Sequence, residues 1–207
     1  MQGTVSIFYF IVLIFSIIVH EVAHGLAAER EGDPTARLQG RITLNPIRHI
    51  DWFGSIVLPG ILILTNAGIV VGWAKPVPFN PDNLRRGNKS IAIVSMAGIA
   101  VNIGIALVFG LGVRALIGSG VATPSIVELM SIIVIVNVVL ALFNAIPLAP
   151  LDGFRFLSAI LPRRTEPFMQ TLERYSLPLL FLFIIFGWKV IAPASFTLYS
   201  LFTGISV

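Results

Sequence analysis

The sequence predicts an all-α polytopic membrane protein with about five to six transmembrane segments, one of them broken or re-entrant, and a small membrane-associated β-hairpin. Hydrophobic residues make up 56% of the 207 residues and charged ones only 12%, and the mean hydropathy is +0.92. A soluble domain carries about a quarter of charged residues. We therefore expect one integral-membrane domain over residues 1–207, with a core at 5–161 and additional spans at 167–206.

The charge and cysteine content restrict the kind of site the chain can form. It has no cysteine, so disulfides and thiolate metal sites are excluded and any metal must be bound by His, Asp or Glu. The net charge of +4 does not indicate nucleic-acid binding, because the basic residues lie in the connections, as the positive-inside rule produces. A removable signal peptide is not expected, since the residues from Met1 to Ser6 include no basic one.

The first apolar run is expected to cross the membrane from about Val5 to Ala28. Several arginines follow it, so its C-terminal end should be cytosolic and the N-terminus external. Residues 37–44 then alternate roughly between polar and apolar side chains, and Asn45-Pro46 is a turn signal. This pattern predicts a short strand or hairpin at the membrane face.

The next apolar segment, Ile50 to Gly72, is interrupted by Pro and Gly, and basic residues flank both of its ends. A simple crossing would place one of the basic clusters outside the cell. We therefore favour a broken, re-entrant segment that returns to the cytosolic side over a full span. The stretch from Lys75 to Pro81 contains too many prolines for a helix and predicts an extended interfacial loop.

The rest of the chain predicts four more crossings. They are expected at Ile91–Ala115, Ile126–Ile146, Pro167–Trp188 and Ile191–Ser206. Between the second and third of these, Pro147 and Pro150 prevent a regular helix, and a short helix follows from Phe154 to Leu161. On this topology all basic residues except Arg114 and Lys189 face the cytosol.

The motif with the clearest chemistry is His-Glu-Val-Ala-His at 20–24, at the end of the uninterrupted apolar run Ile7–Val19. On a helix, His20 and His24 project from one face and can bind a single Zn²⁺. Glu21 lies beside them, where it can accept a proton from a water molecule on the metal. Three ionisable groups in lipid are costly, so the motif predicts a functional site.

A catalytic zinc normally takes three protein ligands, so a third must be found. His49 is one candidate, although a lone histidine in a polar connection is more often structural. Glu128 and Asp152 lie at opposite ends of one predicted crossing, at ~1.5 Å per residue. If that crossing runs inward, Asp152 reaches the depth of the histidine pair and Glu128 does not. Topology thus selects Asp152, while a role as N-cap of the helix from Phe154 is the alternative, and the two roles can coexist.

Asn102 and Asn144 are the other polar groups expected inside the membrane. Such residues often only form hydrogen bonds between helices. The functional alternative is that one or both hold a peptide substrate or stabilise the oxyanion. Asn144 is the stronger candidate, because it precedes Asp152 on the same unwound segment.

Together these residues resemble the site-2 protease family of intramembrane zinc metalloproteases. The matches are the motif at 20–24 and Asn144-Ala-Ile-Pro147, followed by Asp152-Gly153, which fits the family pattern Asn-x-x-Pro…Asp-Gly. Residues 40–46 and 72–78 are similar to the compact bacterial and archaeal branch that lacks a PDZ domain.

The resemblance implies a zinc metalloendopeptidase with one catalytic Zn²⁺ that cleaves a transmembrane protein within the membrane, often a regulatory protein already trimmed by another protease. It implies a multi-pass protein of a prokaryotic plasma membrane, with the active site toward the cytosol. The expected partners are the transmembrane substrate and the lipid bilayer, without nucleic acid. The alternative function is a transporter or metal-permeating protein that uses the histidine pair as a transit site.

Overall fold

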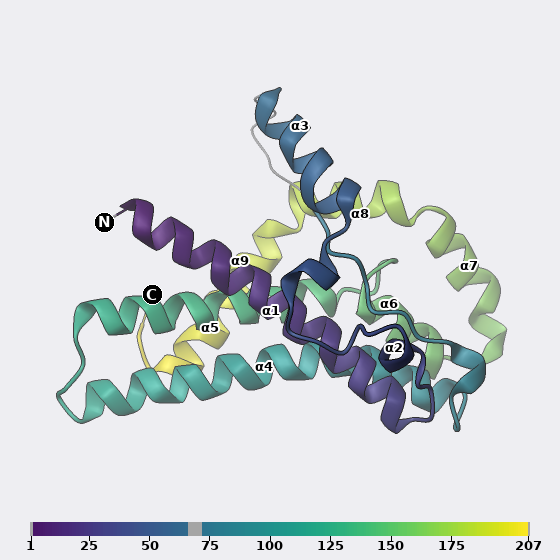
Figure 1. Cartoon of the computed structure of the whole chain (residues 1–207), viewed down its shortest axis with the longest axis horizontal. Helices are drawn as coiled ribbons and strands as arrows, with labels where there is room; N and C mark the ends of the chain where they lie inside the picture. The colour runs from purple at the N-terminus through teal and green to yellow at the C-terminus, as the bar shows by residue number, and fades with distance from the viewer. Residues whose placement is uncertain (1, 66–71, 207) are drawn as a thin grey trace.

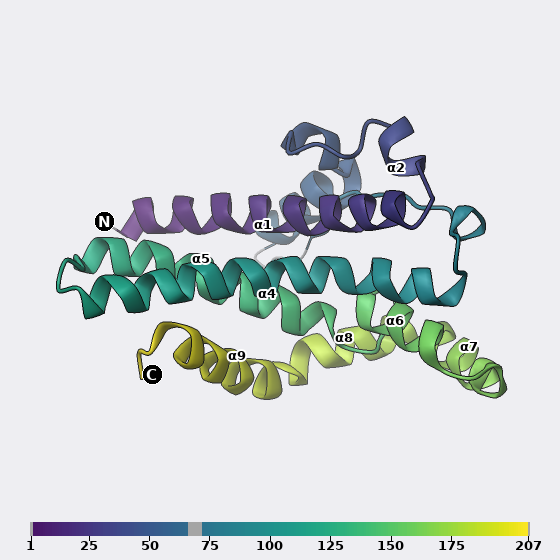
Figure 2. The ribbon, with the colours of Figure 1, turned by 90° about the horizontal axis from the view of Figure 1, so that it is seen from below.

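The computed structural model describes residues 2–65 and 72–206, and its elements in these ranges are helices. Three helices are long and apolar enough to cross a membrane: α1 (Gln2–Arg30), α4 (Asn88–Gly118) and α5 (Pro124–Asn144). Helices α4 and α5 run side by side along the long axis of the molecule, α1 crosses them obliquely, and α4 packs against both of the others (Figure 1, Figure 2). The structure is mostly helical and contains several apolar helices, as the sequence predicts.

Local sequence sets both ends of α5. Thr123 precedes the helix and its hydroxyl oxygen accepts a hydrogen bond from the backbone N–H of Ile126 at 3.4 Å, while Pro124 occupies the first helical position. The helix ends at Asn144, ahead of Pro147 and Pro150. The chain then turns into the short helix α6 (Asp152–Ile160), close to the expected position.

The hairpin predicted from residues 37–44 is not present. These residues belong partly to the helical turn α2 (Thr35–Leu38), and no strand occurs in the ranges that the structure describes. The physical reason is local, because the backbone N–H groups of residues 38–41 donate to the carbonyls of residues 34–37 in tight turns. These backbone donors are therefore already paired within the segment and are not available for a strand ladder.

The predicted re-entrant segment begins with a π-helix (Trp52–Val57) that leads into α3 (Leu58–Leu64), which projects away from the three long helices (Figure 1). Residues 66–71 of this segment lie outside the described ranges. On the far side of them, the backbone N–H of Trp73 donates to the carbonyl of Gly54 at 3.1 Å, and the Ser55 hydroxyl donates to the Trp73 carbonyl at 2.8 Å. The chain thus leaves and returns at the same place, which fits a re-entrant segment.

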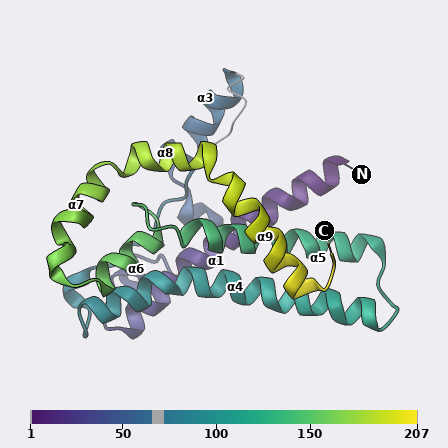
Figure 3. The ribbon, with the colours of Figure 1, turned by 180° about the vertical axis from the view of Figure 1, so that it is seen from behind.

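The crossing predicted at 167–188 is broken into α7 (Glu166–Arg174) and α8 (Ser176–Phe186), which form a 67° bend. Pro178 explains the break, because it has no N–H for the carbonyl of Arg174 and its ring clashes with that carbonyl. The last helix, α9 (Trp188–Thr203), returns to pack against α4 and α5 (Figure 3). The described residues offer three candidate crossings, or four if the bent pair is one span, so the expected five to six are not confirmed.

The connection before α4 is fastened to the end of α1 by two carboxylates. Asp33 is fully buried and accepts hydrogen bonds from the backbone of Asn80 at 2.6 Å and the amide of Asn83 at 2.9 Å. Burial alone would raise the pKa of Asp33, but the hydrogen bonds from Asn83, Thr35 and Asn80 outweigh it and hold that pKa below its ordinary value. The neighbouring Glu31 forms an ion pair with Arg86, whose guanidinium donates hydrogen bonds to the Glu31 carboxylate. These contacts fix the residues that form one wall of the site described next.

Candidate metal centre

His20, His24 and Asp152 come together inside the bundle and are all buried. Their potential ligand atoms lie within 4.8 Å of one another. The Asp152 Oδ2 oxygen is 2.9 Å from His20 Nε2 and 3.0 Å from His24 Nε2, and the two Nε2 atoms are 3.0 Å apart. Three donor atoms thus face one common point.

Each of the three side chains is placed by its own element. The two histidines are one helical turn apart on α1, so they share a face. Asp152 is the first residue of α6 and Leu151 is the N-cap, while the Asp152 carboxylate contacts the two histidines, which argues against the N-cap role. Gly153 permits the turn, because a Cβ there would lie 2.3 Å from the carbonyl oxygen of Ala145. The tight chain path after α5 therefore delivers the carboxylate to the histidines.

Helix α4 orients both imidazole rings through their outer nitrogens. The Nδ1 atom of His24 lies 2.7 Å from the backbone carbonyl oxygen of Val94, and Nδ1 of His20 lies 2.9 Å from Oδ1 of Asn102. Both partners are acceptors, so each Nδ1 carries the proton and each Nε2 presents its lone pair to the centre. The tautomers that a metal requires are thus set by α4.

Asn102 has no exposed surface and lies behind His20. It is not among the residues that line the cavity at the candidate centre, so the prediction that it contacts a substrate stays untested. The contact between Asn102 and His20 could not be predicted from residue spacing, because the two residues are 82 positions apart in the sequence. The position of Asn102 indicates that it orients His20.

Replacing Asn102 by alanine is expected to weaken zinc binding about 10- to 100-fold, because His20 loses the acceptor that fixes its ring and tautomer. The measurement is competition with a chelator on the purified protein. Asn102→Asp keeps an acceptor at the same place and serves as the control, with affinity close to that of the unaltered chain. Unchanged affinity in Asn102→Ala would show that α4 does not orient His20.

The side of the centre that faces α4 is kept open by Gly98. A Cβ added at this residue would lie 2.5 Å from Nε2 of both His20 and His24. Only a residue without a side chain allows α4 to approach the histidine pair so closely. Two imidazole nitrogens and one carboxylate are also a donor set typical of catalytic zinc, so the residues fit this ion.

Glu21 lines a cavity of about 100 Å³ together with the three candidate ligands and Asn144. One of its oxygens, Oε2, accepts a hydrogen bond from the backbone N–H of Val77 at 2.7 Å. Val77 belongs to the extended stretch that the prolines predict, and Arg41 binds the carbonyls of the two residues before it. The roles of Val77 and Arg41 were not visible in the sequence, because both depend on contacts between distant segments.

The remaining candidates lie elsewhere or are partly engaged. The ring of His49 is buried, with Nε2 2.8 Å from the carbonyl oxygen of Thr43, and it does not belong to the group of candidate ligands. Glu128 is exposed. Asn144 lines the cavity, but its amide donates to the carbonyl of Leu140 at 3.0 Å.

A helical membrane protein that places two histidines and an aspartate beside a glutamate has the residue set of a membrane-embedded metallohydrolase. Residues 112–187 match the description Peptidase family M50. The chain is 36% identical over 193 residues to "Putative zinc metalloprotease YwhC" of Bacillus subtilis, in a match covering 88% of this chain and 80% of that one. The chain therefore belongs to peptidase family M50, which confirms the predicted class of enzyme, a zinc metalloprotease.

More distant relatives carry similar names. "Putative zinc metalloprotease Rip2" of Mycobacterium tuberculosis is 26% identical over 84% of this chain and 66% of its own length. "Putative zinc metalloprotease Rip3" of the same species is 31% identical over 74% of this chain, but the match spans only 31% of its own length. No solved structure matches the chain.

Proposed function

We propose that this chain is an intramembrane protease that hydrolyses a peptide bond in a transmembrane substrate, in regulated intramembrane proteolysis. The observation that carries the proposal is the place of the centre. His20, Glu21 and His24 lie within the candidate span Val5–Arg30 of α1, and Asp152 joins them there. A peptide bond that reaches them must come from a segment at the same depth in the bilayer.

In this proposal His20, His24 and Asp152 hold one Zn²⁺. When bound, zinc polarises the scissile carbonyl and activates a water molecule for attack on it. Glu21 accepts a proton as the water oxygen bonds to the carbonyl carbon, and returns it to the amine nitrogen as the carbon–nitrogen bond breaks. The hydrogen bond from Val77 occupies Oε2, and Oε1 accepts no hydrogen bond from the described residues, so it is free to take the proton.

We further propose that the protein spans the plasma membrane of a prokaryote, with the centre toward the cytosol. The arginines that follow α1 support this orientation, because basic residues accumulate on the cytosolic side. The two species named above are bacteria. The histidine pair lies in the half of α1 that leads to these arginines, so water reaches it from that side.

Glu21→Gln tests the protease against the alternative of a transporter with a histidine transit site. We expect zinc content to stay unchanged and cleavage of single-span reporter proteins in reconstituted vesicles to fall by about 10²–10⁴-fold, because the proton acceptor is lost. Glu128→Gln, a change on an exposed face away from the centre, is the control and should cleave as the unaltered chain does. Retained cleavage in Glu21→Gln would refute the enzyme mechanism.

Asn144 is proposed to hold the substrate. Its amide nitrogen has two hydrogens, of which one goes to the Leu140 carbonyl and the other remains for a substrate carbonyl or the oxyanion. Asn144→Leu is expected to slow cleavage without releasing zinc. The pair of measurements is reporter cleavage and bound zinc, and an unchanged cleavage rate excludes this role.

A further inference from the structure

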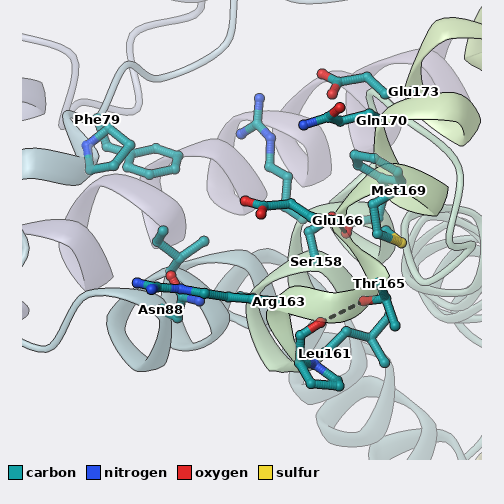
Figure 4. A pocket seen from close by; sticks show the side chains of 16 residues that line it. Phe79, Asn88, Ser158, Leu161, Arg163, Thr165, Glu166, Met169, Gln170 and Glu173 are labelled. Atoms are coloured by element: carbon teal, nitrogen blue, oxygen red, sulfur yellow. Dashed lines mark hydrogen bonds between the residues drawn. The ribbon is translucent and has the colours of Figure 1, made fainter.

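A second, larger cavity of about 720 Å³ opens next to the metal centre, between the connection before α4 and the helices α6 and α7 (Figure 4). It shares two lining residues, Phe79 and Arg155, with the small cavity that contains the candidate ligands. The guanidinium of Arg155 lies over the ring of Phe79, 5.7 Å from its centroid. The two cavities are therefore neighbours that meet at this pair.

The walls of the larger cavity differ in character. Phe154 and Met169 are buried and form an apolar base. Glu166, Gln170 and Glu173 line it from α7, where their spacing places them on one face of the helix. Figure 4 shows Gln170 and Glu173 together along α7.

The two glutamates are exposed and form no ion pair within the part of the chain that the structure describes. Two cations also line the cavity. Arg155 lies over the Phe79 ring, and Figure 4 draws Arg163 away from Gln170 and Glu173. The α7 wall thus carries two carboxylates that neither arginine pairs with in the described residues, beside an apolar base. Such a wall favours a ligand that has both cationic and apolar groups.

We propose that this cavity binds the basic cytosolic flank of the transmembrane substrate while the adjoining segment lies at the metal centre. The inference rests on the proposed function. The cytosolic end of a transmembrane helix is enriched in Lys and Arg, which complement Glu166 and Glu173, and the apolar first residues beyond the helix suit the base. The volume is within the range of about 300–1,000 Å³ that ligand sites occupy. Phe79 and Arg155 then lie where the flank passes toward the small cavity.

Crosslinking tests this docking without requiring cleavage, because the chain has no cysteine of its own. Gln170→Cys is introduced together with Glu21→Gln, and the purified zinc-loaded protein is incubated with single-span peptides that carry one cysteine in their flank. This cysteine is activated as a mixed disulfide with thiopyridine, so attack by the introduced thiol forms the crosslink and releases thiopyridone. One peptide has a lysine-rich flank and a matched one has a serine-rich flank. We expect disulfide formation to be about tenfold faster with the lysine-rich flank, and this preference to disappear when Glu166→Lys and Glu173→Lys are added.

Ser119→Cys, exposed at the other end of α4, is the matched control, because it corrects for any general reactivity of the lysine-flanked cysteine. Equal rates for the two peptides at Gln170→Cys, or the same preference at Ser119→Cys, would overturn the docking proposal.

Cleavage by the protein with Glu21 intact separates this inference from the proposed function. Selective crosslinking without cleavage of the lysine-flanked peptide would keep the docking site and refute the protease. Cleavage without selective crosslinking would keep the protease and refute the docking site.

Discussion

Replacement of Asp152 by alanine is expected to release zinc from the purified protein and to abolish cleavage of reporter proteins. Two histidines alone are one ligand short of the three that a catalytic zinc normally takes. Loss of a residue that merely orients a ligand weakens metal binding about 10- to 100-fold, so loss of the ligand itself should weaken it by at least about 100-fold. Zinc content after gel filtration, measured by elemental analysis, reports the effect directly.

The helices should survive this substitution. Leu151 and not Asp152 is the N-cap of α6, and the Asp152 carboxylate contacts the two histidines, so its removal should leave the start of that helix in place. Helix content from circular dichroism is therefore expected to match that of the parent chain, which separates loss of metal from loss of fold. His49→Ala is the matched control and should keep its zinc, since that ring bonds to the Thr43 carbonyl. Full zinc occupancy in Asp152→Ala would mean that another residue is the third ligand.

The sequence was sufficient for the parts of the candidate site that depend on short spacing or on depth. His20, Glu21 and His24 follow from one turn of a helix. Asp152 follows from the direction in which two crossings run, because only one end of α5 comes to the level of the histidines. The structure places these four residues together.

The contacts between distant segments were not predictable in this way. Asn102 orients His20 across 82 positions, and Val77 binds Glu21 across 56. Neither spacing nor hydropathy carries information about which faces of α1 and α4 meet. The predicted hairpin is a different case, because the alternation of side chains over residues 37–44 does not show that the backbone of residues 38–41 closes tight turns on residues 34–37.

The predicted C-terminal crossings are not confirmed, for a different reason. The prediction treated residues 167–188 as one apolar run, although their first half is the polar helix α7 and only the second half, α8, is apolar. The average hydropathy over the whole run conceals the change from polar to apolar residues at Tyr175. The bend at that point is what gives the larger cavity its α7 wall.

Gly98→Ala is expected to disrupt the metal centre although it adds only one methyl group. That group would lie 2.5 Å from Nε2 of both His20 and His24, in the space between the rings and the backbone of α4. The rings must turn away or α4 must retreat, and a retreat would pull Val94 and Asn102 from the outer nitrogens. We expect zinc affinity to fall by more than about tenfold, as for loss of the orienting contacts themselves, and overpacking to cost about 1–3 kcal/mol of unfolding free energy.

Gly104→Ala supplies the control on the same helix. A Cβ at this position meets no atom within 4 Å, so the substitution adds the same methyl group without a clash. Alanine is a better helix former than glycine by about 1 kcal/mol, and Gly104→Ala should therefore keep its zinc and melt no lower than the parent chain. If both variants bound zinc equally well, α4 would have to lie farther from the histidines than this structure places it. If only Gly98→Ala loses zinc, then zinc binding requires the close approach of α4 to the histidines as well as the three ligands.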